Sequence, residues 1–277
     1  MTSTGVRRKA LWRIDLEEML REVVVYRELL YQMTRRDLLL RYKQTIMGVG
    51  WAVLMPLTNT AVFSVIFMRI AATPLDTGGV PYPLFAYTGL AAWNFFAAST
   101  RFAVGSLTSN PQLVSKVYFP REVFPFSSVI VSLVDFSVSF VVIAILMTYY
   151  GVMPTATVLF LPVIIAIQVM VTAGCAMLLA VGNLFFRDVK YLFEVVISIA
   201  MFATSAVYPV SRIGGTLGMV FAANPMTIII DAYRDVLLFG RLPAAGPFAI
   251  TALVSVVFFL WAWFTFHRAE FKFAENI

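Results

Sequence analysis

The sequence predicts an all-α integral membrane protein with six transmembrane helices. Hydrophobic residues make up 60% of its 277 residues and charged residues only 13%, whereas a soluble domain carries about 25% charged residues. Long uncharged apolar runs recur along the chain, and basic residues flank them. Membrane orientation and anionic lipid therefore explain the net charge of +6 better than binding to nucleic acid does.

Six apolar segments are long enough to cross a bilayer, which takes about 20 residues in a helix. They are residues 49–71, 84–104, 124–150, 157–185, 191–208 and 248–266. Pro56 and Pro162 lie inside two of them and are expected to kink those helices. The predicted organisation is a cytoplasmic N-terminal region over 1–48, a six-helix transmembrane domain over 49–266 and a cytoplasmic tail over 267–277.

The distribution of Lys and Arg predicts which side of the membrane holds the termini. With a cytoplasmic N-terminus, the inner segments contain 17 of the 21 basic residues. The outer segments contain only Arg69, Arg212, Arg234 and Arg241. Because inner loops carry an excess of basic residues, both termini are expected in the cytoplasm.

The segment before the first span, residues 15–46, predicts an amphipathic helix, or two. Leu16, Met19, Leu20 and Val23 recur at helical spacing and form an apolar stripe. Such a helix lies on the inner membrane surface or packs against a partner protein.

The inner loop over 105–122 contains a second non-spanning helix. Asn110 is a good N-cap, Pro111 suits the first helical position, and Pro120 disfavours helix at the residue before it. A two-turn helix held between prolines is either a stiff loop or a docking element.

A third non-spanning helix is predicted in the outer loop over 209–246. The helix is expected to begin after a cap at Asn224, with Pro225 at its first position, and to end near Gly240. About 15 residues are too few to cross the bilayer. A re-entrant or interfacial outer helix is therefore predicted.

The sequence contains few of the residue patterns that are typical of an enzyme. The sequence contains no G-x-x-x-x-G-K-[ST] motif, so the chain cannot supply a P-loop for ATP. It has one histidine, His267, and one cysteine, Cys175. This makes a metal site improbable and leaves no plausible Ser/His/Asp set. We expect a chain that is not an enzyme and binds no cofactor itself.

Two acidic residues inside the predicted spans need partners. Asp135 lies well inside the third span, where a carboxylate is costly. A hydrogen bond to a nearby serine or to a neighbouring helix is preferred over a proton or substrate site. Glu194 lies near the inner end of the fifth span and is expected to pair with Arg187 or Lys190.

Residues 35–57, R-R-D-L-L-L-R-Y-K-Q-T-I-M-G-V-G-W-A-V-L-M-P-L, resemble a motif of the permease subunits of ATP-binding cassette (ABC) exporters for polysaccharides and polyol phosphates. These are the O-antigen, capsule and teichoic acid exporters. The matching residues are Asp37, Leu38, Arg41, Tyr42, Lys43, Thr45, Gly48, Trp51 and Pro56, while Met47 replaces the usual Leu. Further matches follow in family order at 116–125, 186–190, 208–211, 224–234 and 266–277.

The resemblance implies roles for the non-spanning segments. The N-terminal amphipathic helix would contact an ATPase subunit, and the 110–122 element would be the coupling helix seated in it. The implied coupling residues are Arg36, Asp37, Arg41, Lys43, Lys116, Val117, Tyr118, Phe119, Pro120, Arg121 and Glu122. The implied outer gate residues are Asn224, Pro225, Tyr233 and Arg234. Aromatic faces and amides suit sugars, so the candidates for the substrate path are Trp93, Asn94, Phe95, Phe96 and Tyr208.

The resemblance also implies partners. A separate ATPase subunit would bind ATP and Mg²⁺, a second copy of the chain or a paralogue would complete the channel, and a lipid-linked polysaccharide such as O-antigen would be the cargo in the bacterial cytoplasmic membrane. Two alternatives stay open. One is an ABC exporter permease for a drug or small lipid, and the other is a membrane channel or scaffold that needs no ATP.

Overall fold

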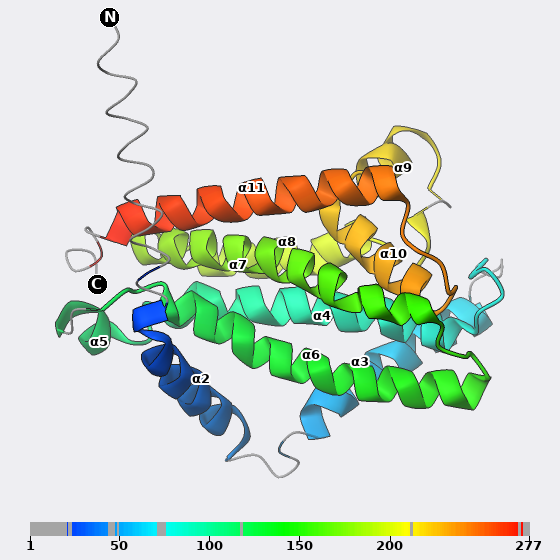
Figure 1. Ribbon diagram of the computed structural model, residues 1–277, viewed down its shortest axis with the longest axis horizontal. Helices are drawn as coiled ribbons and strands as arrows, with labels where there is room; N and C mark the ends of the chain where they lie inside the picture. Colours follow the sequence, from blue (N-terminus) through cyan, green and yellow to red (C-terminus); the bar gives the residue numbers. More distant parts are fainter. Residues whose placement is uncertain are drawn as a thin grey trace, which may run out of the picture.

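The computed structural model describes residues 21, 24–43, 48, 50–70, 76–116, 119–210, 213–270 and 273. This part of the chain is helical and contains no strand, which confirms the all-α prediction. Its long helices run side by side as a bundle (Figure 1). They are α4 (Tyr82–Ser106), α6 (Val123–Tyr150), α7 (Leu161–Phe185) and α11 (Ala245–Ala269).

Shorter elements cover the two ends and the outside of this bundle. They are α2 (Arg27–Tyr42), α3 (Gly50–Val65) with its π-helical extension η1 (Ile66–Ile70), α5 (Pro111–Lys116), η2 (Ala156–Phe160), α8 (Val189–Ala200), η3 (Met201–Ala203), α9 (Gly215–Ala222) and α10 (Pro225–Leu237). The short helix α5 and the last turn of α11 lie at one end of the bundle, and α9 and α10 lie at the other (Figure 1). We refer to these as the α5 end and the α10 end.

Among the described residues, four helices are long and apolar enough to cross a membrane. They are Gly50–Met68, Val123–Tyr150, Ala156–Phe185 and Ala245–Ala269, which correspond to the first, third, fourth and sixth predicted spans. The α9 and α10 helices meet at a bend of 72°, and together they are long and apolar enough for a broken span or a re-entrant loop. The predicted helix after Asn224 is confirmed, and its re-entrant position stays a prediction.

The second and fifth predicted spans differ from this group. Helix α4 has 25 residues and is the most enclosed of the long helices, but it carries polar side chains such as Thr88, Asn94 and Arg101 and is less apolar. The helix predicted over 191–208 ends at Ala200 instead, followed by a short 3₁₀ turn. At about 1.5 Å per residue, the 12 residues of α8 are too short for a full crossing.

The core is largely apolar, with one buried polar contact at its centre. The Phe136 ring stacks on Phe95 and meets Tyr233 edge-on, at centroid distances of 5.1 and 5.7 Å. Beside them, the Tyr233 hydroxyl donates to Gln168 Oε1 at 2.7 Å, and Gln168 Nε2 donates to the Ala92 carbonyl at 2.7 Å. Buried polar groups are stable only when bonded in this way, so these bonds fix α10 against α7 and α4.

Candidate functional site

Helix α2 is fixed to the bundle by its inward-facing polar residues. Asp37 accepts hydrogen bonds from Arg36 Nη2 at 2.8 Å and from Ser127 Oγ of α6 at 2.8 Å. Arg36 Nη1 also donates to Asn110 Oδ1, at the start of α5, at 3.2 Å. Two of the predicted coupling residues therefore hold α2, α5 and α6 together. Residues 15–20, 22–23 and 44–46 of the predicted amphipathic segment, which include its whole apolar stripe (Leu16, Met19, Leu20 and Val23), lie outside the described residues.

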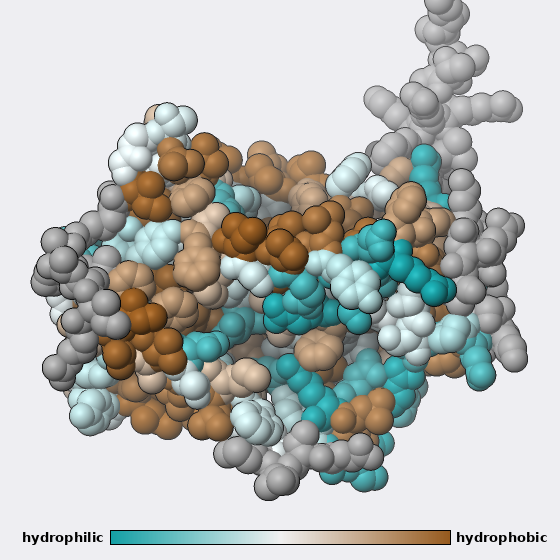
Figure 2. Space-filling model, turned by 180° about the vertical axis from the view of Figure 1, so that it is seen from behind, coloured by the Kyte–Doolittle hydropathy of each residue, from teal (hydrophilic) through white to brown (hydrophobic). Residues whose placement is uncertain are grey.

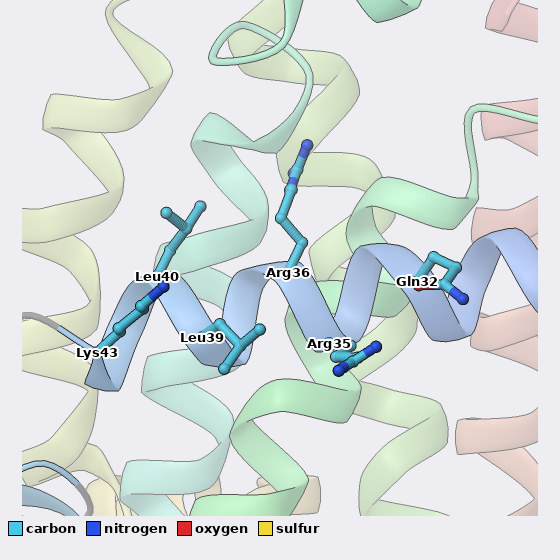
Figure 3. A pocket seen from close by; sticks show the side chains of 6 residues that line it. All are labelled: Gln32, Arg35, Arg36, Leu39, Leu40 and Lys43. Atoms are coloured by element: carbon cyan, nitrogen blue, oxygen red, sulfur yellow. The ribbon is translucent and has the colours of Figure 1, made fainter.

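The opposite face of α2 combines basic and apolar side chains. Figure 3 looks onto this face, with Arg36 and Leu40 along its upper edge and Arg35 and Leu39 along its lower edge. Together with Gln32 and Lys43 they line a concavity of about 440 Å³. Leu40 is 70% exposed. A surface of this kind suits anionic lipid headgroups or an acidic protein surface.

Asp135 finds its partners on α2. Arg41 Nη1 lies 2.7 Å from Asp135 Oδ2, and the Tyr42 hydroxyl donates to Asp135 Oδ1. The Arg41 guanidinium also lies 4.4 Å from the centroid of the Phe102 ring. Burial lowers the pKa of Arg41, while the Asp135 carboxylate raises it. This agrees with the prediction that Asp135 bonds to a neighbouring helix.

This ion pair borders a cavity of about 480 Å³ between α2, α3, α4 and α6. Its lining alternates aromatic rings with amides, hydroxyls and charges. The side chains that matter here are Trp51, Asn59, Asn94, Phe95, Arg101, Phe102, Ser132 and Ser139. Aromatic faces and hydrogen-bonding groups together suit a polyhydroxylated ligand better than a purely apolar one.

The structure brings only some of the predicted path residues to this cavity. Asn94 and Phe95 line it. Trp93 is buried and packs against Phe96, with ring centroids 5.6 Å apart. Tyr208 lies near the η3 turn, where its hydroxyl donates to the Phe202 carbonyl. Prediction by residue type alone could not separate these aromatics, because helical phase decides which of them face the cavity.

Sequence reasoning missed two polar residues of the cavity. Asn59 is the one amide in its apolar span, a signal that could have identified it. Arg101 Nε lies 2.9 Å from Glu194 Oε2 of α8. The expected pairing of Glu194 with Arg187 or Lys190 is therefore wrong, since its partner comes from a helix about 90 residues earlier, which no sequence pattern indicates.

The face opposite to the view of Figure 1 is not uniformly hydrophobic. Hydrophilic residues gather in a band through its middle and toward the α5 end, between hydrophobic areas (Figure 2). Polar side chains are costly against lipid tails and usually face a protein partner or a wet cavity. This band therefore indicates a surface that is shielded from lipid.

A charged cluster joins the segment after α5 to the end of α11. We call Arg121, Glu122, His267 and Glu270 the Arg121 cluster. Glu270 Oε1 accepts from the Arg121 backbone N–H at 3.0 Å and from Arg121 Nη1 at 3.2 Å. Glu122 Oε1 lies 3.1 Å from His267 Nδ1, and only 2% of Glu122 is exposed. Because Arg121 and His267 already meet the two carboxylates, we interpret this as an ion-pair cluster, although its ligand atoms lie close enough to hold a metal.

Two more of the predicted coupling residues directly precede this cluster in the chain. Phe119 and Pro120 are buried, and Lys116 ends α5. Val117, Tyr118 and the side chain of Lys116 lie outside the described part of the chain.

The Arg121 cluster predicts how the folding stability of the chain depends on pH. Burial and the neighbouring Glu122 carboxylate raise the pKa of Glu270 from 4.5 to about 6, against the lowering effect of Arg121 and His267. The folded chain therefore binds this proton more tightly than the unfolded chain, and Glu270 adds stability as the pH falls from 6 toward 4.5. At about 1.4 kcal/mol per pKa unit, the gain is about 2 kcal/mol.

In Glu270→Gln this contribution is absent. The melting temperature of the purified variant should change less between pH 4.5 and 6.5 than that of the wild type. Glu194→Gln, at a more exposed ion pair, is the control and should keep the wild-type slope. Equal slopes for wild type and Glu270→Gln would contradict the prediction.

At the α10 end, Asn224 and Pro225 act as the sequence predicts for a helix start. The Asn224 side chain accepts from the Met226 backbone N–H at 3.0 Å, and Pro225 takes the first helical position. Tyr233 and Arg234 are buried. Arg234 donates to the Phe85 and Ala206 carbonyls at 3.2 and 2.9 Å. Both side chains thus anchor α10 to the bundle within the described chain.

Residues 28–238 match the family model for ABC-2 type transporters. The chain belongs to the ABC-2 type transporter family. Among its relatives is the O-antigen export system permease protein RfbA of Myxococcus xanthus, 31% identical over 94% of this chain and 99% of the relative. A protein of the same name from Klebsiella pneumoniae is 28% identical over 90% of this chain and 94% of the relative.

The family match extends across most of the site. It includes α2, the cavity helices α3, α4 and α6, Arg121 and Glu122, and α10. The partners of Arg121 and Glu122 on α11, His267 and Glu270, lie beyond it. The relatives of this ABC-2 chain are permease subunits rather than enzymes.

Proposed function

We propose that this chain is the permease subunit of an ABC exporter that moves a lipid-linked polysaccharide, such as O-antigen, across the cytoplasmic membrane. The observation that carries the proposal is the match to an O-antigen export permease over 99% of that relative's length. A match of this extent concerns the whole transport subunit rather than one shared segment.

The cavity beside the Arg41–Asp135 pair supports a carbohydrate cargo. Asn59 and Asn94 can donate to and accept from sugar hydroxyls, and the exposed Trp51 offers an aromatic face to a sugar ring. Most of the lining is apolar, as in other ligand sites, so the support for a polysaccharide comes from these few polar groups.

The energy for export would come from another polypeptide. Because the sequence contains no P-loop, a separate ATPase subunit would bind ATP and Mg²⁺. The surface formed by α2 and the 111–122 segment would receive that subunit on the cytoplasmic side. Two copies of the chain, each with both termini in the cytoplasm, would enclose the channel.

A pulldown from native membranes tests this proposal. The tagged chain should bring down a P-loop ATPase subunit and a lipid-linked glycan, while an unrelated tagged inner-membrane protein brings down neither. Cells that lack the chain should accumulate the glycan on the cytoplasmic side. Transport without any ATPase would favour a channel, and a small apolar cargo would favour a drug or lipid exporter; either result contradicts the proposal.

The predicted topology can be tested separately. A reporter that is active only in the periplasm, fused after Ile277, should stay inactive because the tail is expected in the cytoplasm. A periplasmic signal would overturn the assignment of sides.

A further inference from the structure

The Arg121 cluster connects α5 to α11 through one side chain. Arg121 Nε and Nη2 donate to the Val114 carbonyl of α5 at 3.3 and 3.1 Å. The same guanidinium donates through Nη1 to Glu270 Oε1 at the end of α11. The planar fork of arginine can serve both partners at once, which a lysine ammonium on a flexible stem does less well. A displacement of α5 would therefore pull directly on α11.

The surroundings of the cluster make this connection rigid. Val114 and Phe266 are fully buried, and Phe119 is 5% exposed. Ion pairs and hydrogen bonds in such a water-poor setting are stronger than at a surface. The second contact, between Glu122 and His267, joins the start of α6 to α11 one helical turn before Glu270. Two short contacts within an apolar shell leave little freedom for the segments to slide past each other.

Helix α11 extends from the cluster to the opposite end of the bundle. Its 25 residues form one continuous helix, about 37 Å long at 1.5 Å per residue. Along this length α11 packs on α7, and it also contacts α10. A push on its last turn can therefore reach the α10 end as the movement of a single rigid element.

We infer that the Arg121 cluster transmits movement of α5 to α11, with Arg121 as the positioning residue that joins them. The inference rests on the proposed function, in which an ATPase subunit acts on the 111–122 segment. It adds α11 as the element that carries this movement to the α10 end. Arg121 acts through Glu270 and Val114, not on the cargo.

Arg121→Lys is the variant that tests the inference, because it keeps the positive charge but loses the fork. We measure lipid-linked glycan exported per ATP hydrolysed, with the permease–ATPase complex in proteoliposomes and glycan extracted from the producing cells. This ratio, which is normalised to the ATP hydrolysed, should fall at least fivefold. The matched control is Arg268→Lys. Arg268 lies on the last turn of α11, close to Glu270, but it is exposed and stacks over Phe264 of its own helix. Its ratio should stay within twofold.

Hydrogen exchange on the same complexes separates the inference from the proposed function. ATP binding should change the exchange rates of the α5 amides and of the last turn of α11 in the wild type. In Arg121→Lys the change in α5 should persist and the change in α11 should disappear. Persistence of both changes, or an unaltered export ratio, would overturn the inference. Absence of any change in the wild-type α5 would instead contradict the proposed function.

Discussion

Replacing Arg234 by methionine is expected to destabilise the α10 end of the bundle more than any other single change considered. The guanidinium is 2% exposed, pairs with Asp231 at 3.2 Å and lies 3.6 Å from the centroid of the Phe85 ring. Methionine fills part of the space but leaves the Phe85 and Ala206 carbonyls without their donor. Each buried carbonyl left without a donor costs about 1–3 kcal/mol, and the half-exposed Asp231 carboxylate also loses its partner.

The melting temperature of the purified protein measures this effect. The matched control is Arg241→Met, which removes an arginine from the same region. Arg241 pairs with Asp235 but is 68% exposed, so we expect a loss of at most about 1 kcal/mol. Equal losses for the two variants would show that burial of Arg234 does not contribute.

Gly89 offers a second approach to the same contact. A Cβ atom at this position would lie 2.3 Å from both the Ala206 carbonyl oxygen and Arg234 Nη2. The glycine is therefore needed for the close approach of α4 to the Ala206 carbonyl and to the Arg234 side chain. Gly89→Ala should also lower the melting temperature. Its effect should be smaller in the Arg234→Met background, because one of the two clashing groups is absent there.

The fold was predictable where local sequence decides the structure. Asn224 and Pro225 start α10 as expected because capping depends on neighbouring residues. The apolar runs identified four spanning helices by length and composition. The end of α8 at Ala200 was not predictable in this way, since the next residues are as apolar as those within the helix.

The polar contacts of the site were less predictable, because their partners are distant in the sequence. Arg234 bonds to a carbonyl 149 residues earlier, and Arg121 to a carboxylate 149 residues later. Resemblance to a family marked these arginines as important but assigned them to an outer gate and to an ATPase contact. The structure adds that both also hold helices together, which follows from the arrangement of the bundle and not from any motif.

The Arg41–Asp135 pair should behave as a structural unit in a double-mutant cycle. Removal of either charge leaves the other half-buried without its partner, and we expect Asp135→Leu and Arg41→Met each to cost about 3 kcal/mol of folding free energy. The double variant leaves no charge behind and should recover most of the loss. Tyr42→Phe removes one hydrogen bond to Asp135 and should cost about 1 kcal/mol.

The cycle compares the wild type, Asp135→Leu, Arg41→Met and the double variant. Their melting temperatures, measured at one pH, give the coupling energy between the two residues. Additive losses would show that the two residues do not depend on each other. Export assays on the same set decide between the two interpretations of Asp135. If the pair only holds α2 against α6, export recovers with stability in the double variant. If Asp135 carries a proton or contacts the cargo, the double variant is stable but does not export, because the carboxylate itself is then required.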